Sequence, residues 1–427
     1  MSDAKTDSDT DSVSAPRRSA RRRWRWPLAL LLVIVFLLFD IGPTVPAPGP
    51  PSAPQAEGVR LMVQRTQAAL VGGNGHAQLF YTGADLTSAA VLAGNIRSLG
   101  QFDAHLASGS ARFRMSQQLL GPVWINITAD VGNSRNGFPP VRLRIGRLPL
   151  GEALSRRVVG LAQWVMKERG IKTPPLDTLV NGVYIAPAGI TASVYLPGSG
   201  DVGRGLAGLR SAPVDAAAAA RIYCYLVQRE AHETTDDFAQ VVNRAFTAPS
   251  GLSDPVEGNR AAFVALASYT VGPGAMRLAK GMQEKTAACN SAYRSAKIVG
   301  RDDLPKHWSL SAALSVTLGD DLSTAMGEWK ELSDSRPSGT GFSFVDLAAD
   351  RSGLAAAKRA TDPAGASAFA ARLRKATAEQ IIPIGALALS EGLTEAEFVS
   401  RYGTIDSKAF ADATARVDQV IARTVGE

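Results

Sequence analysis

The chain has 427 residues, which is enough for two or three domains, and its composition, 45% hydrophobic and 20% charged, is that of a globular protein. Part of the net charge of +7 is a basic run at the start of the chain, between Arg17 and Arg25. Elsewhere both signs of charge are mixed, and no stripe of Lys and Arg alternates with aromatic residues, which argues against nucleic acid as a partner.

The first predicted element is a membrane anchor. Residues 1–23 are polar and are expected to form a disordered basic tail. An apolar run over residues 26–39 comes next, and with its flanks it gives a span of 24–42, close to the ~20 residues that cross a bilayer. Asp40 interrupts the span, and a cleaved secretory signal is the alternative. The long basic tail and the lack of a clean A-x-A cleavage site favour an uncleaved signal anchor.

The arginines before this span predict its orientation, because basic residues stay on the cytoplasmic side. We therefore expect a single-pass protein of the inner membrane, with its N-terminus cytoplasmic and its C-terminal bulk periplasmic. The proline-rich residues 43–56 are interpreted as a semi-rigid linker between the membrane and the folded part of the chain.

Residues 57–198 are predicted to form a small α+β domain with an antiparallel sheet. The pattern indicates a helix that ends near Gly72, a second helix from Thr82, several strands with alternating polarity between 102 and 150, a long helix over 150–169 and two final strands. His76 and His105 lie in this domain without a carboxylate at ligand spacing, so we assign them no role in a site.

Residues 209–427 are predicted to form an all-α helical domain, after a glycine-rich joint at 198–208. The expected helices include 214–229, 235–245, 254–271 and a long amphipathic helix over 275–298. The chain as a whole is thus expected to be α+β, with a transmembrane helix, an antiparallel-sheet domain and a helical domain. Cys224 and Cys289 are the only cysteines, and the sequence leaves open whether they pair.

The densest group of ionisable residues lies in 327–353, with a glycine-rich turn at 337–341 between two predicted helices, 321–334 and 343–360. A third helix, 303–318, carries His307. Short loops make consecutive helices neighbours, so their polar faces are expected to meet. The residues that would converge are His307, Lys330, Glu331, Asp334, Asp346 and Asp350.

Three roles fit this set of side chains. The carboxylates of Asp334, Asp346 and Asp350 could hold a divalent cation such as Mg²⁺, Mn²⁺ or Ca²⁺. Crowded carboxylates raise one another's pKa, so Asp334 or Asp350 with His307 could form a catalytic acid–base pair. In that case Lys330 and Glu331 would support the reaction.

The third role is a salt-bridge network with a purely structural function. Ser343 and Asp346 have the spacing of a helix cap, and Lys330 and Asp334 have the spacing of an ordinary ion pair within a helix. Asp350, an acid among Ala, Leu and Gly, fits the structural role least well.

The two motifs His307–Leu314 (H-W-x-x-S-A-x-L) and 327–353 (G-x-x-K-E-L-x-D-S-R-P-x-G-T-G-F-S-F-x-D-L-A-x-D-x-x-G) resemble the YfiM-like family of bacterial envelope lipoproteins. The resemblance covers about residues 303–353 and implies an envelope location and a compact helical module. It carries over to the same six residues named above but implies no reaction. The whole chain also resembles single-span envelope proteins of proteobacteria.

The sequence therefore predicts a periplasm-facing protein of the cell envelope, tethered to the membrane. Its acidic and histidine residues are expected to bind a divalent cation or a polar envelope ligand, with hydrolysis of glycan or lipid headgroups as a further expectation. The alternative is a non-catalytic scaffold of an envelope complex, with a protein partner on the α+β domain.

Overall fold

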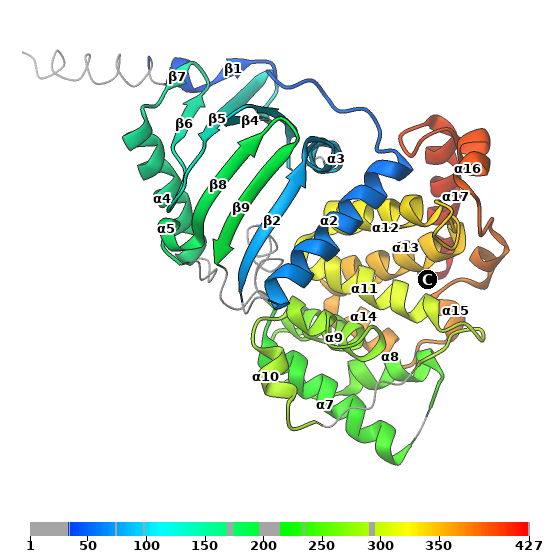
Figure 1. The fold of residues 1–427 in the computed structure, drawn as a ribbon. Helices are drawn as coiled ribbons and strands as arrows, with labels where there is room; N and C mark the ends of the chain where they lie inside the picture. The colour runs from blue at the N-terminus through cyan, green and yellow to red at the C-terminus, as the bar shows by residue number, and fades with distance from the viewer. Residues whose placement is uncertain are drawn as a thin grey trace, which may run out of the picture.

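The computed structural model describes Val33 and residues 35–72, 75–96, 99–168, 174–195, 214–233, 235–289 and 295–425. The fold is mixed α+β, with antiparallel sheets in the first half of the chain and helices in the second (Figure 1). Most of the predicted membrane span, residues 24–32 and Ile34, lies outside the described residues, as does the whole glycine-rich joint at 198–208. Within the described part of the chain, no helix has both the length and the apolar character needed to cross a membrane.

The first half holds two antiparallel sheets, where the sequence predicted a single one. The larger sheet has the order β3-β4-β5-β6-β7, with β1 paired to β5. Its strands are β1 (Asp40–Ile41), β3 (Gln101–Ala107), β4 (Ser110–Leu120), β5 (Val123–Gly132), β6 (Val141–Ile145) and β7 (Leu148–Pro149). The smaller sheet has the order β2-β9-β8, from β2 (His76–Thr82), β8 (Val180–Ala186) and β9 (Gly189–Tyr195). Ala111, Val183 and Ile185 form a small buried core where the two sheets meet.

Three helices flank these sheets: α3 (Gly83–Gly94), α4 (Glu152–Glu168) and the short α5 (Leu176–Leu179). The N-terminus of α3 is where the sequence predicts it, because Thr82 and Asp85 form a reciprocal capping box. Strand β2 was not predicted, since its seven residues lie between two stronger helical signals.

Residues 43–56 do not stand free as a spacer. The main-chain amides of Thr44 and Val45 both donate to Ser116 Oγ, at 3.1 and 3.0 Å, and Val45 is only 1% exposed. Helix α2 (Ala53–Gly72) begins inside this stretch and runs between β2 and the helical half of the molecule (Figure 1). The linker therefore lies on the larger sheet, and α2 joins the two halves.

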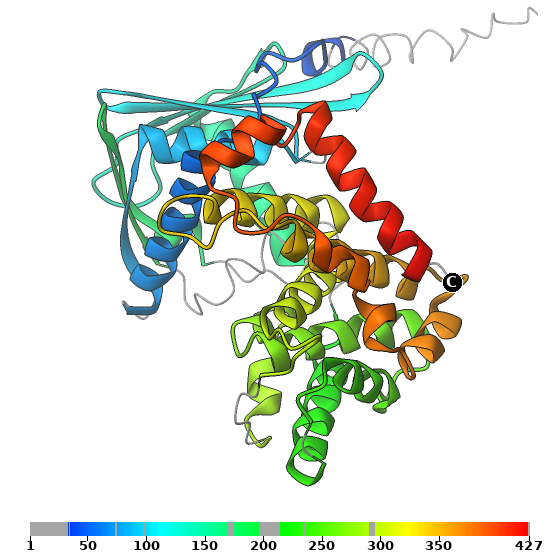
Figure 2. The ribbon, with the colours of Figure 1, turned by 90° about the vertical axis from the view of Figure 1, so that its right-hand side faces the viewer.

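The second half is helical, as predicted. Its long helices are α7 (Ala216–His232), α8 (Phe238–Thr247), α9 (Pro255–Thr270), α11 (Asp303–Leu318), α12 (Asp320–Asp334), α13 (Phe344–Ala360) and α17 (Lys408–Val425). Shorter ones are α10 (Met282–Thr286), α14 (Ala366–Leu373), α15 (Ala378–Ile381), α16 (Glu395–Tyr402) and the 3₁₀ turns η3 (Ala275–Leu278) and η4 (Ile384–Ala388). Helix α9 is buried along Asn259–Thr270 and packs against α7, α11 and α14. Figure 2 shows α17, in red, along the outside of this half, where it packs on α13.

The predicted long helix over 275–298 is wrong. Among the described residues of this range, 275–289 and 295–298, the helical elements are η3 and α10, and Gly281 between them adopts a left-handed conformation (φ +82°) that ends helical geometry. Cys289, which follows α10, forms a disulfide with Cys224 of α7, with Cα atoms 5.4 Å apart.

Candidate metal site between three helices

The candidate site depends on the close packing of α11 on α13. Gly353 of α13 lies against the main chain of Trp308 of α11, so closely that a Cβ atom at this position would overlap the Trp308 carbonyl. The indole of Trp308 is fully buried in the core beside Phe238 and Phe263. Because His307 precedes Trp308 and Asp350 lies one turn before Gly353, this contact brings His307 and Asp350 together.

Helix α12 supplies the third side of the site with a glycine and an acid on one face. Gly327 lets α12 approach the Asp350 carboxylate closely, since a Cβ there would lie only 3.0 Å from Asp350 Oδ2. Glu331 comes one turn later on the same face and is completely buried. The helix is held to α11 by Ser323, whose hydroxyl donates to the Ser311 carbonyl at 2.9 Å.

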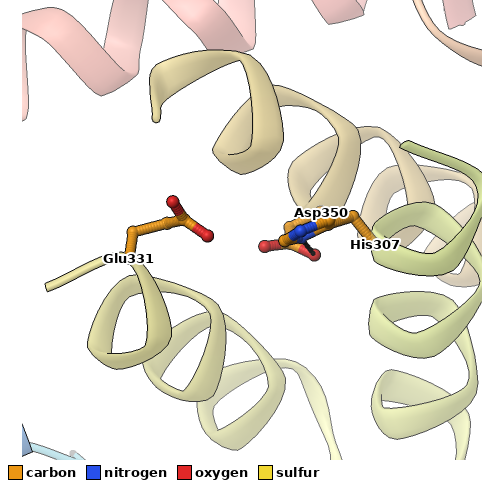
Figure 3. Close-up of side chains that lie close together, drawn as sticks. All are labelled: His307, Glu331 and Asp350. Atoms are coloured by element: carbon orange, nitrogen blue, oxygen red, sulfur yellow. Dashed lines mark hydrogen bonds and ion pairs between the residues drawn. The ribbon is translucent and has the colours of Figure 1, made fainter. Parts of the chain in front are cut away.

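The Asp350 carboxylate is the centre of the cluster. Its Oδ1 lies 3.2 Å from His307 Nδ1 and accepts a hydrogen bond of 2.7 Å from Ser311 Oγ. Its Oδ2 is buried and has no hydrogen-bond partner in the described part of the chain. Figure 3 shows the carboxylates of Glu331 and Asp350 facing each other across a short space, with the His307 ring against Asp350.

Glu331 is fixed at both carboxylate oxygens. Oε1 accepts a hydrogen bond of 2.8 Å from Lys330 Nζ, and Oε2 accepts one of 3.1 Å from the main-chain amide of Ser343 at the start of α13. An acid with no exposed surface is costly unless it is paired, and these two bonds provide that pairing. The carboxylate is thus held in one orientation, toward Asp350.

His307, Glu331 and Asp350 have the spacing of metal ligands. One nitrogen or oxygen atom from each can be chosen so that all three lie within 4.8 Å of one another. The side chains of His307 and Asp350 are each only 10% exposed. One imidazole and two carboxylates are a donor set found at divalent metal sites.

Asp346 orients His307 from the opposite side. Its Oδ2 lies 3.4 Å from His307 Nε2, and its Oδ1 accepts a hydrogen bond of 3.1 Å from Arg301. Its main-chain amide also donates to Ser343 Oγ at 3.0 Å, so the predicted helix cap is present as well. Each ring nitrogen of His307 therefore faces a different aspartate.

The electrostatics of the cluster favour bound protons. Burial is the largest single influence on the pKa of His307 and lowers it, but the charge of Asp350, its hydrogen bond and the charge of Asp346 together outweigh burial and raise that pKa to about 9. Burial raises the pKa of Glu331 to about 7 despite the neighbouring Lys330, and it raises the pKa of Asp346. Without a bound ion, His307 is therefore an imidazolium at neutral pH.

Two residues named from the sequence lie at the edge of the cluster. Asp334 Oδ2 contacts Lys330 Nζ at 2.8 Å and lies outside the group with metal-ligand spacing. The Lys330 side chain is 46% exposed and links Asp334 to Glu331. The acid that α12 contributes to this group is Glu331, where the sequence favoured Asp334.

Sequence reasoning missed two other contributors. Gly327 is the first residue of the motif, but its position in the sequence does not show that it makes room for the Asp350 side chain. Arg301 lies before α11 and contacts Asp303, Asp346 and Glu391, the last two at 3.1 and 2.7 Å. Asp303 consequently pairs with Arg301. No local signal identifies Glu391, which comes from the loop before α16.

The arrangement does not form a serine-hydrolase triad. In such a triad the serine bonds the histidine, and the histidine bonds the acid. Here Ser311 and His307 both contact the same oxygen of Asp350. The serine is thus a hydrogen-bond donor that fixes the carboxylate.

Comparison of the chain with protein-family models, with curated proteins and with solved structures gives no match. The chemistry of the site must therefore be inferred from its own geometry.

Proposed function

We propose that the helical half of this protein binds one divalent metal ion through His307, Glu331 and Asp350. The observation that carries the proposal is Asp350 Oδ2, a buried carboxylate oxygen without a partner in the described residues, which lies close to Gly327 of α12. A buried oxygen of this kind costs free energy unless something binds it. A cation within reach of Glu331 and His307 would satisfy it.

The donor set favours a transition metal such as Mn²⁺ or Zn²⁺ over Mg²⁺ or Ca²⁺. The latter two prefer ligand sets made of oxygen alone, whereas imidazole nitrogen suits Zn²⁺ and other transition metals. The protein ligands are almost fully buried. We therefore propose that the site binds the ion and assign no reaction to it. A bound ion would supply positive charge that offsets the two carboxylates.

Asp346 and Arg301 would support this ion indirectly. A metal-binding histidine commonly donates its second ring N–H to a carboxylate, which fixes the ring and makes the other nitrogen a better ligand. Asp346 Oδ2 is placed to accept from His307 Nε2, and Arg301 holds Asp346 in turn. His307 Nδ1 is then left for the metal, on the side of Asp350.

We also propose that the protein is anchored in the inner membrane and faces the periplasm. The support comes from the apolar residues 26–39 behind a run of arginines, and from the disulfide between Cys224 and Cys289, which is typical of an oxidising compartment. A reporter fused after Glu427 tests this, since an active cytoplasmic reporter at that end would contradict it.

One observation favours a second candidate, a structural ion-pair network in a scaffold protein. Protonated His307 lies between Asp346 and Asp350 and would neutralise part of their charge without any metal. In this case the cluster stabilises the contact of α11 with α13, and removal of one partner costs about 3–5 kcal/mol.

Thermal unfolding of the full chain, first freed of metal with a chelator, separates the two candidates. Metal binding predicts that Mn²⁺ or Zn²⁺ raises the melting temperature, with a gain of about 2.7 kcal/mol at a hundredfold excess over Kd. Asp350→Asn should abolish the rise, whereas the matched control Asp334→Asn should keep it. If no ion changes the melting of the wild type and Asp350→Asn still unfolds early, the structural network is the correct explanation.

A further inference from the structure

A second group of charged residues lies on the larger sheet, far from the helices of the metal site in sequence. Strand pairing places these side chains in two adjacent rows on one face. The first row is His105, Arg112, Asp130 and Arg142, and the second is Asp103, Arg114, Thr128 and Arg144. The next pair on this face, Ser116 with Asn126, is buried under residues 44–45, so the open part of the face begins at Arg114 and Thr128.

Six of these residues line a pocket of about 270 Å³: His105, Arg112, Arg114, Thr128, Asp130 and Arg144. Three arginines therefore face one aspartate across the pocket, and the neighbouring Asp103 pairs with Arg114. Such a surplus of positive charge in a concave site attracts an anion. A volume of this size holds a phosphate group together with part of the molecule that carries it.

Several hydrogen-bonding groups in the pocket are available to a ligand. Arg144 is exposed and has no ion pair among the described residues, and the Thr128 hydroxyl has no partner there. The Nε–H of Arg114 is buried and makes no hydrogen bond to any described residue, although its Nη2 donates to Asp103. An unpaired buried guanidinium N–H is costly without a partner.

We propose that this pocket binds a phosphate group between Arg114 and Arg144, over Thr128. Neighbouring strands are about 4.8 Å apart, so the two arginines emerge about 10 Å apart on either side of Thr128 and can both reach one group. Guanidinium groups bind phosphate oxygens in pairs, and a hydroxyl donates to a third oxygen. Arg112, held by Asp130 at 2.6 Å, closes the side of the pocket.

Binding of phosphate and of glycerol phosphate to the purified full chain, measured by calorimetry, tests this proposal. Arg144→Gln should weaken binding at least about tenfold, the loss that corresponds to one charge-assisted contact. Arg142→Gln is the matched control: Arg142 lies on the same strand and face, is exposed, and does not line the pocket. It should change the affinity less than about twofold, since only long-range charge is lost.

Calorimetry with water-soluble short-chain lipids identifies the source of the phosphate group, since a membrane-anchored chain would insert into any vesicle. Binding of free phosphate or glycerol phosphate that Arg144→Gln removes supports a soluble ligand. Binding only to short-chain phosphatidic acid, and not to short-chain phosphatidylcholine, supports a lipid headgroup if Arg144→Gln again removes it. The proposal is overturned if the wild type binds none of these probes, or if Arg142→Gln and Arg144→Gln weaken binding equally.

Discussion

Gly353 of α13 lies directly against the main-chain carbonyl of Trp308 in α11, and this contact sets how closely the two helices approach. Any side chain at 353 must push α11 away, because the atom it meets belongs to the backbone and cannot rotate aside. The same displacement would separate His307 from Asp350. One glycine thus links the packing of the helical half to the geometry of the candidate site.

Gly353→Ala is therefore expected to destabilise the protein by at least about 2 kcal/mol, as overpacked cores do. Urea unfolding of wild type and variant measures the change. Gly58→Ala in α2 is the matched control, because a Cβ there meets only Ser88 Oγ at 3.9 Å, an ordinary contact. It should stabilise the chain by up to about 1 kcal/mol, the usual gain of alanine in a helix. Equal effects of the two changes would contradict the role given to Gly353.

Gly327→Ala tests the space beside Asp350. Its Cβ would lie 3.0 Å from Asp350 Oδ2, the oxygen that the proposed ion must contact. We expect the affinity for Mn²⁺ or Zn²⁺ to fall at least about tenfold, which is about 1.4 kcal/mol. The stability of the metal-free chain should change by less than about 1 kcal/mol, because the gain in helix propensity offsets part of the crowding. Unchanged metal affinity would place the ion elsewhere.

The metal-free protein should lose stability as the pH rises from 6.5 to above 9. The folded state raises the pKa of His307 from 6.5 to about 9, so it binds a proton that the unfolded state releases over this range. The contribution is complete below pH 6.5 and is lost above 9. It is roughly 3 kcal/mol, since one pKa unit corresponds to about 1.4 kcal/mol. Urea unfolding at several pH values in chelator measures it.

His307→Gln should flatten this dependence, and that result separates His307 from the other titrating groups. Glu331 also has a raised pKa, about 7, so its own contribution is lost between pH 4.5 and 7 and overlaps the His307 window only at its lower end. A slope above about pH 7.5 that persists in His307→Gln would show that another group carries it.

The helices of the site were predictable because their signals are local. The expected helices 303–318, 321–334 and 343–360 agree closely with α11, α12 and α13. Gly319 separates α11 from α12, and Ser343 caps the start of α13. Short connections make these three helices neighbours, which predicted that His307 and Asp350 would lie in one cluster. The small residue at Gly353, which allows close approach, was also readable in the motif.

The rotation of each helix about its own axis was not predictable. Glu331 and Asp334 are three residues apart, and either could have faced Asp350. The structure turns Glu331 inward because Gly327, one turn earlier, allows contact with α13, while Asp334 at the helix end stays with Lys330. In the sheets, alternation predicted β3 to β6 but not their pairing, so the rows of arginines on the larger sheet could not be seen.

The disulfide between Cys224 and Cys289 leads to the last prediction, because it joins α7 to the segment after α10 across 65 residues of chain. A loop of this length removes enough freedom from the unfolded chain to stabilise the fold by about 4 kcal/mol. Reduction, or the change of both cysteines to serine, should therefore lower the urea midpoint of the purified chain. A reducing agent should have no further effect on the double-serine variant, which serves as the control. The metal-dependent rise in melting temperature should survive reduction, since α11, α12 and α13 lie outside the closed loop. If reduction also removes that rise, the site depends on the α7–α10 region, and the three-helix description of it is incomplete.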